Sequence, residues 1–262
     1  MDLGLNRRVA FVAAGSKGLG QAVAEELARE GAAVAICARG QSALDAAVAT
    51  IRAAGGHAHG VVADVSRVED IARAVTEAEA ALGPIEILVT NSGGPKSGKF
   101  ESLTPADWDS AASVLLTSAV TLTRTVLPGM KARRWGRILN ITSIAAKQPV
   151  DGLMLSNSLR AAVVAFARTL ANEVATDGVT VNNLLPGYTR TERVIDLSAQ
   201  IAARESISVD EVYARWEREV PMQRIGEPRE FAALAAFLAS ERASYITGQS
   251  IAIDGGWIKS MM

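Results

Sequence analysis

The sequence predicts an α/β fold of the Rossmann-like, doubly wound type, with one seven-stranded parallel sheet and helices on both of its faces. Short apolar runs alternate with longer helical segments along the 262 residues. Each run is almost continuously apolar, which is typical of strands that are buried on both faces. A glycine-rich loop follows the first run directly and leads into a helix, which is the usual start of such a sheet.

Strands are predicted where the apolar runs are short, and helices where apolar residues recur at helical spacing. We expect Gly31 to end the first helix and Pro128 to bend or end a long helix in the middle of the chain. In chain order, the predicted elements are strand 7–15, helix 21–31, strand 32–39, helix 42–56, strand 57–65, helix 68–83, strand 85–93, helix 104–134, strand 135–143, helix 156–178, strand 179–187, helix 228–240 and strand 249–256.

The sequence contains no linker, repeat or low-complexity segment, so residues 1–262 are predicted to form a single dinucleotide-binding domain. Residues 189–223 interrupt the alternation, are rich in charge and contain Tyr213 and Trp216. Insertions of this length in compact domains are usually functional. We interpret the segment as a helical lid over a substrate site at the carboxyl ends of the strands; a surface excursion is the alternative.

Composition excludes several classes of partner. The net charge is −1, which gives no broad attraction to nucleic acid or to anionic lipid. No uninterrupted apolar stretch of about 18 residues is present, so no membrane span is predicted. Cys37 is the single cysteine, which excludes an intramolecular disulfide and fits a cytoplasmic location. The two histidines lie in no ligand pattern, so no metal site is predicted.

The glycine loop predicts a phosphate-binding site. Gly15, Gly18 and Gly20 follow the first strand, and a helix begins at once. Glycines let the backbone turn sharply and approach a phosphate, and the helix N-terminus offers free N–H groups to the anion. The residues predicted to bind the cofactor here are Gly15, Ser16, Lys17, Gly18, Leu19 and Gly20.

The end of the second strand indicates which dinucleotide is bound. A carboxylate there would bind the ribose hydroxyls of NAD, but the run ends in Ala38 and Arg39. Arg39 and Lys17 together suit a ribose 2′-phosphate, so NADP(H) is favoured over NAD(H). The alternative is that both are solvated surface charges.

Seven motifs together identify a family. The chain resembles the short-chain dehydrogenases/reductases over nearly its full length, and within them the 3-oxoacyl-[acyl-carrier-protein] reductases. The motifs are AAGSKGLG at 13–20, ADV at 63–65, NSGG at 91–94, ITS at 141–143, LPGYTRT at 185–191, RIGEPREFA at 224–232 and YITGQSIAIDGG at 245–256.

The resemblance implies further site residues. Ser143 matches the serine that holds the substrate carbonyl. The other matches lie beside the adenine, behind the cofactor, or next to the nicotinamide. They are Asp64 and Val65; Asn91, Ser92 and Gly93; and Pro186, Gly187 and Thr189.

The resemblance breaks at the catalytic residues. The family has a tyrosine thirteen residues after the serine, a lysine four residues later, and an asparagine on the long helix. Counting from Ser143 gives Ser156 and Arg160, and counting from Trp108 on the long helix gives Leu115. The site is therefore predicted to be an atypical one.

The substitutions change the expected chemistry. A tyrosine beside an ammonium can protonate a developing alkoxide, but a serine hydroxyl is a far weaker acid and arginine does not release its proton. Arg160 can still hold ribose hydroxyls or stabilise an oxyanion. Lys147 and Tyr188 are alternative proton donors. The structural alternative is that Ser156 or Asn157 caps the helix and Arg160 lies on its solvated face.

Three functions follow from these observations. The first is an NADP-dependent oxidoreductase that acts on a small-molecule carbonyl or alcohol by a non-standard proton path. The second is a nucleotide-binding sensor or partner subunit without turnover, and the third is a non-redox lyase or isomerase. The resemblance also implies a homotetramer or homodimer. Four arginines in the lid segment indicate an anionic substrate, although acidic neighbours offset them: Arg190, Arg193, Arg204 and Arg215.

Overall fold

The computed structural model describes residues 2–260 and contains the predicted sheet. All seven strands are parallel, in the order β3-β2-β1-β4-β5-β6-β7, so the predicted fold class is confirmed. From β1, strands β2 and β3 extend the sheet to one side, and strands β4 to β7 extend it to the other. The point between β1 and β4 where this order reverses is the usual location of a ligand crevice in such sheets. The strands are β1 Val9–Val12, β2 Ala33–Ala38, β3 His57–Val62, β4 Ile87–Thr90, β5 Gly136–Ile141, β6 Val179–Pro186 and β7 Ser250–Ile253.

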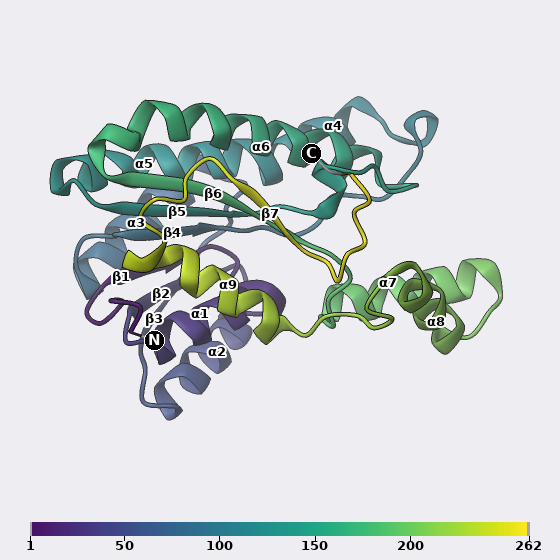
Figure 1. The fold of residues 1–262 in the computed structure, drawn as a ribbon, viewed down its shortest axis with the longest axis horizontal. Coiled ribbons are helices and arrows are strands. Elements are labelled where there is room, and N and C mark those ends of the chain that lie inside the picture. The colour runs from purple at the N-terminus through teal and green to yellow at the C-terminus, as the bar shows by residue number, and fades with distance from the viewer. Residues whose placement is uncertain (1, 261–262) are drawn as a thin grey trace.

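Helices cover both faces of the sheet (Figure 1). One layer contains α1 (Gly18–Arg29), α2 (Gln41–Ala53) and α9 (Pro228–Ala239). The opposite layer contains α3 (Val68–Leu82), α4 (Pro105–Ala112), α5 (Ser118–Arg133) and α6 (Met154–Val174). Short 3-10 turns are found at η1 (Phe100–Ser102), η3 (Ile144–Ala146), η4 (Ala175–Asp177) and η5 (Glu241–Ala243).

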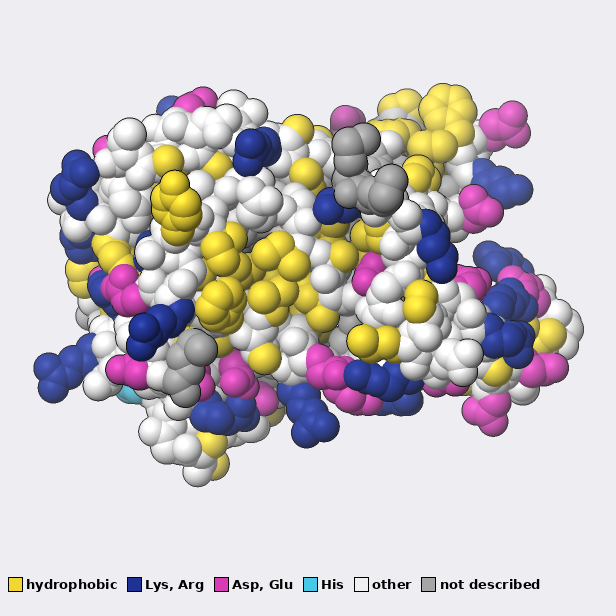
Figure 2. Space-filling model, in the orientation of Figure 1, with side chains coloured by type: hydrophobic (Ala, Val, Ile, Leu, Met, Phe, Trp, Pro, Cys, Tyr) yellow, Lys and Arg dark blue, Asp and Glu magenta, His cyan; other side chains and the backbone are white. Residues whose placement is uncertain are grey.

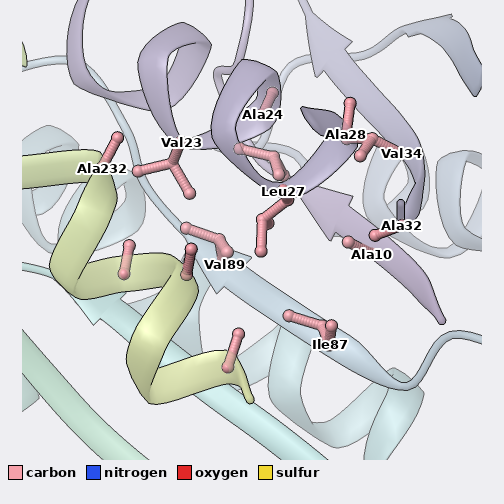
Figure 3. Close-up of a cluster of buried hydrophobic side chains, with 14 of the residues drawn as sticks. Ala10, Val23, Ala24, Leu27, Ala28, Ala32, Val34, Ile87, Val89 and Ala232 are labelled. Carbon is pink, nitrogen blue, oxygen red and sulfur yellow. The ribbon is translucent and has the colours of Figure 1, made fainter. Parts of the chain in front are cut away.

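The core between α1, α9 and the sheet is built from small aliphatic side chains. Figure 3 shows Val23, Ala24 and Leu27 of α1 beside Ala232 of α9, above Val89 of β4. All five are fully or almost fully buried. Alanines at this contact let two helices and the sheet approach closely, which fixes the start of α1 relative to the strand ends.

The long helix differs from its prediction. The expected helix 104–134 is α4, a π-helical turn η2 (Ser113–Thr117) and α5 in one continuous run. Pro128 lies inside α5, which continues to Arg133, so the prediction that it ends the helix is wrong. The departure from regular geometry falls at the π turn instead, and such turns often accompany functional sites.

The helix Pro105–Arg133 is long and apolar enough to cross a membrane by length and composition alone, a test that core helices of soluble proteins also pass. Its inner face is occupied: Leu122, Val126 and Met130 pack against the sheet. Within residues 2–260, no three histidine, cysteine or acidic side chains come together as a metal site. Cys37 is buried in β2, and burial raises the pKa of its thiol to about 11.

A chain of buried polar side chains crosses the sheet between the strands that hold the reaction site. Thr90 Oγ1 donates to Asn140 Oδ1 (2.7 Å), Asn140 Nδ2 donates to Asn183 Oδ1 (3.1 Å), and Asn183 Nδ2 donates to Ser250 Oγ (3.1 Å). Buried amides cost stability unless they are paired, and here each has a partner. These side-chain hydrogen bonds therefore fix the register between the neighbouring strands from β4 to β7.

Residues 189–223 form two helices, α7 (Glu192–Glu205) and α8 (Val209–Glu219), which project from the body in Figure 1. They have a small core of their own, made of Ala202, Val212, Trp216 and Ile225. Tyr188 stacks on Trp216 with ring centroids 4.8 Å apart. The segment is thus an ordered helical hairpin with its own small core.

Candidate functional site

One cavity of about 640 Å³ lies at the carboxyl ends of the strands, within the size range of cofactor and ligand sites. It extends from the glycine loop past the ends of β2 and β4 to β5, α6 and the first turn of α7. The predicted site residues that line it are Ser16, Lys17, Gly18, Leu19, Arg39, Asp64, Val65, Asn91, Ser92, Gly93, Ser143, Ser156, Arg160, Pro186, Gly187 and Thr189.

The glycine loop has no room for side chains at two positions. A Cβ on Gly15 would come 1.9 Å from Cγ2 of Ile36, so this glycine lies against β2 and behind the cavity wall. A Cβ on Gly20 would come 2.6 Å from the carbonyl oxygen of Ala14. Gly18 has a φ of +56°, a conformation that favours glycine. The loop is therefore shaped as a backbone cradle.

The start of α1 provides the donors of this cradle. Lys17 is the N-cap residue, and its side chain makes no capping hydrogen bond. The N–H groups of the first helical turn thus have no side-chain acceptor, and the helix dipole favours an anion there. Asn91 Nδ2 donates to the carbonyl oxygen of Ala14 (3.2 Å) and ties the end of β4 to the loop. These residues fit the diphosphate of a dinucleotide.

The adenosine end of the cavity has one acidic and one basic side chain. Burial raises the pKa of Asp64, but hydrogen bonds from the N–H and hydroxyl of Ser66 (2.9 and 2.8 Å) outweigh it, and the pKa is lowered overall. The positive charge of Arg39 lowers it further. Asp64 is thus a fixed carboxylate, and Arg39 is exposed at the mouth of the cavity.

Lys17 makes an ion pair that could not be predicted from the sequence. Its Nζ lies 2.9 Å from Oε2 of Glu192, the first residue of α7. Both side chains are more than half exposed, so the pair contributes little stability. It does connect the glycine loop to the 189–223 segment at the edge of the cavity.

Ser143 has a free hydroxyl hydrogen. It precedes the short turn η3, and its Oγ accepts a hydrogen bond from the N–H of Ala145 (3.1 Å). Because the oxygen is used as an acceptor there, the hydroxyl hydrogen can be donated toward the cavity. This geometry suits a group that holds a carbonyl oxygen.

Ser156 and Asn157 do not cap α6, so the capping interpretation is wrong. The helix begins at Met154, and its N-cap is Leu153, which makes no side-chain cap. Ser156 is buried and lines the cavity. The Asn157 side chain bonds the N–H and the carbonyl oxygen of Val150 (3.2 and 3.0 Å) and holds the loop before the helix.

Arg160 does not lie on a solvated face. Its Nη1 donates to the carbonyl oxygens of Ile141 and Thr142 (3.1 and 2.7 Å), at the end of β5. Arg160 is also one of the residues that line the cavity. Burial, and secondarily the positive charge of Arg193, lowers the pKa of Arg160 to about 10, so it remains protonated at neutral pH.

The structure does not bring the two alternative proton donors to the cavity. Lys147 is exposed and is absent from the cavity wall. Tyr188 faces the core of the 189–223 segment, where burial and the carboxylate of Glu219 raise its pKa to about 12. A tyrosine with a raised pKa is a weaker acid, so neither residue is placed for protonation.

Sequence reasoning missed most of the contribution of α7. Its first two turns supply Glu192, Arg193, Val194, Asp196 and Leu197 to the cavity wall. The charge and length of segment 189–223 indicated a lid but did not show which helical face points inward. Leu115, implied by the resemblance to replace an asparagine, is buried and apolar.

Comparison with known proteins agrees with this geometry. A family model described as enoyl-(acyl carrier protein) reductase matches residues 13–258. The 3-oxoacyl-[acyl-carrier-protein] reductase FabG of Aquifex aeolicus is 33% identical over 98% of this chain and 99% of its own. The acetoacetyl-CoA reductase of Shinella zoogloeoides is 35% identical over 95% of this chain and 98% of its own.

The chain belongs to the short-chain dehydrogenase/reductase family. L-Sorbose reductase from Gluconobacter frateurii, solved with NADPH and L-sorbose, superposes with a TM-score of 0.95 at 32% identity and covers both chains completely. The family resemblance drawn from the seven sequence motifs is thereby confirmed.

Proposed function

We propose that this short-chain dehydrogenase/reductase is an NADP-dependent oxidoreductase that acts on a carbonyl or alcohol substrate without the family's tyrosine and lysine. The observation that carries the proposal is the single cavity that joins the phosphate cradle of α1 to Ser143, Ser156 and Arg160. Relatives named as reductases support it, including the FabG protein and L-sorbose reductase.

The preference for NADP(H) is supported by charge. No carboxylate ends β2, and Arg39 and Lys17 both line the cavity. Both can bind a ribose 2′-phosphate, Lys17 by leaving Glu192. When bound, the nicotinamide supplies or accepts the hydride. Neighbours solved with NADPH are consistent with this choice.

The protein's own residues orient the carbonyl and stabilise negative charge on its oxygen. Ser143 donates its free hydroxyl hydrogen to the carbonyl oxygen, and Arg160 places a permanent positive charge beside it. Ser156 offers a second hydroxyl from the buried first turn of α6. Because Arg160 does not release its proton, the proton of the product comes through the serine hydroxyls from solvent.

Residues at the end of the sheet support a homo-oligomer. β7 is the last strand, and none of its residues is fully buried. Figure 2 shows hydrophobic side chains gathered over β7 and α9. Separately, Leu234 and Phe237 of α9 and Ile251 and Ile253 of β7 are only partly buried. A second copy covering this face would form the homodimer, or half of the homotetramer, that the family resemblance implies. Light scattering of the purified protein measures its molar mass in solution; the mass of a monomer would contradict this proposal.

Activity is tested with three serine variants and NADPH. We expect Ser143→Ala to lower kcat for reduction of a carbonyl substrate about 100-fold, the usual cost of losing one oxyanion donor. Ser156→Ala is expected to lower kcat about tenfold. Ser158→Ala, an exposed serine on the same helix, is the matched control and retains full activity. Fluorescence titration with NADPH is expected to give the same affinity for all three.

The same experiment separates the three functions. Binding of NADPH without reduction of any compound in a broad carbonyl panel would contradict the proposal and favour a sensor. Product formed without oxidation of NADPH would favour a lyase or isomerase. Equal rates for Ser143→Ala and Ser158→Ala would remove Ser143 from the reaction.

A further inference from the structure

Three arginines on the cavity wall make no ion pair within residues 2–260: Arg39 after β2, and Arg160 and Arg193 on two helices. Arg160 comes from α6 and Arg193 from the first turn of α7. Among residues 2–260, the hydrogen bonds of the Arg160 side chain go to the carbonyl oxygens of Ile141 and Thr142, through one of its nitrogens. Within residues 2–260, neither arginine makes an ion pair. Two positive charges therefore face the same space.

The other lid arginines behave differently. Arg190 is paired with Glu227 (3.2 Å), while Arg204 and Arg215 both bind Glu205 (2.9 and 2.8 Å). These pairs explain how the acidic residues of the segment offset its arginines, as the sequence suggested. Arg193 is the exception among the four, and it is the one that reaches the cavity.

The position of Arg193 is set by its neighbours on both sides. The neighbouring Glu192 pairs with Lys17 of the glycine loop, so the first turn of α7 lies beside that loop. The guanidinium of Arg193 lies against the loop after β4: a methyl group on Gly94 would come 3.3 Å from its Nε and Nη2. Arg193 thus extends from α7 to the opposite wall of the cavity.

The electrostatics favour an anion between the two arginines. The charge of Arg193 adds to burial in lowering the pKa of Arg160, which indicates that the two groups repel each other. Glu192 is paired with Lys17. The other α7 carboxylate on the cavity wall, Asp196, pairs with neither arginine. A carboxylate or phosphate placed here would offset both charges and accept several hydrogen bonds.

We propose that Arg160 and Arg193 form a binding site for an anionic group, a carboxylate or phosphate, of the substrate. The inference rests on the proposed function, because it places that anion within the cavity that contains Ser143. It defines the substrate class as small carbonyl compounds that carry a negative charge. The 189–223 segment then selects the substrate through Arg193 and does not merely cover it.

The test uses the purified protein with and without NADP⁺, titrated calorimetrically with malonate and with inorganic phosphate. We expect at least one of the two anions to bind the wild type, and Arg193→Gln to weaken that binding about tenfold. Arg193 is exposed, so the variant is expected to fold. Arg190→Gln, a neighbouring arginine paired outside the cavity, is the control and retains wild-type binding. Dimethyl malonate, which lacks the charges, is expected not to bind.

A parallel NADPH titration distinguishes the source of the anion. If Arg193→Gln weakens NADPH about tenfold and leaves malonate and phosphate unchanged, the two arginines bind the cofactor's diphosphate and the substrate site is overturned. Failure of both anions to bind the wild type, or equal weakening in Arg190→Gln, also overturns it. Anion binding that depends on Arg193, in a protein that reduces no carbonyl, would retain this site and contradict the proposed oxidoreductase.

Discussion

The two ends of the cavity were built under different constraints. At the glycine loop, the proposed binding would depend on backbone N–H groups, and a side chain at Gly20 would strike the backbone of Ala14. At β5 and α6, the proposed chemistry would depend on side chains, and Ser156 and Arg160 occupy positions where the family resemblance implies tyrosine and lysine. The first end fits its family pattern, whereas the second departs from it.

This contrast shows which part of such a fold tolerates change. A phosphate cradle made of backbone can lose no glycine without moving a helix, but a side chain on a rigid helix can be exchanged while its neighbours stay in place. Arg160 retains a positive charge at the lysine position and adds two hydrogen bonds to the end of β5. Serine and arginine in place of tyrosine and lysine are therefore expected to change proton transfer in the site more than they change its net charge.

The largest effect is expected at the cradle itself. In Gly20→Ala, the new Cβ would lie 2.6 Å from the Ala14 carbonyl oxygen and 2.7 Å from Nδ2 of Asn91, so the start of α1 must shift. Losing two charge-assisted hydrogen bonds to the diphosphate is expected to weaken NADPH binding about 100-fold, measured by fluorescence titration. Gly40→Ala, where a Cβ meets open space, is the control. Unchanged affinity in Gly20→Ala would show that the loop does not bind the cofactor.

The cradle end is also the part that the sequence predicts best. The order of strands and helices, the glycine loop and the residues beside it all follow from local patterns of spacing and hydrophobicity. Such patterns are visible along the chain because each strand is buried on both faces. The structure places sixteen of the predicted cofactor and reaction residues on one cavity wall, because the carboxyl ends of all strands of a parallel sheet share an edge.

The reaction end could be predicted only in part. Ser143, Ser156 and Arg160 were identified by counting, but the direction of the Arg160 side chain depends on carbonyl groups at the end of β5, which are distant in sequence. Tyr188 was a reasonable donor by position, yet its ring is drawn into the aromatic core with Trp216. The sequence of helix α7 does not indicate which of its faces is turned toward the cavity, because that face carries charged as well as apolar residues.

A second prediction concerns cofactor choice at the mouth of the cavity. Arg39→Ala removes one charged donor for a ribose 2′-phosphate, so NADPH affinity is expected to fall about tenfold and NADH affinity to stay unchanged. Arg67→Ala, an exposed arginine outside the cavity wall, serves as the control. An equal loss for both nucleotides would place Arg39 against a group that the two cofactors share.

The smallest expected effect lies where the two ends of the cavity meet. In the free protein, Lys17 is paired with Glu192 at 2.9 Å, and it must leave this carboxylate to bind a 2′-phosphate. Glu192→Gln removes the competition, so NADPH affinity is expected to rise about threefold at low salt, the scale of an exposed ion pair, and NADH affinity to stay constant. The gain should shrink as salt is added, because exposed charges are screened.

Glu205→Gln is the matched control, since it breaks ion pairs on the same helix without touching the glycine loop. If both glutamine variants tighten NADPH equally, the gain reflects net charge and not the release of Lys17. If Glu192→Gln weakens NADPH instead, the ion pair supports the cofactor site by fixing the first turn of α7. In that case the cradle and the 189–223 segment act as one binding unit, and the contrast between the two ends of the cavity is smaller than their sequences suggest.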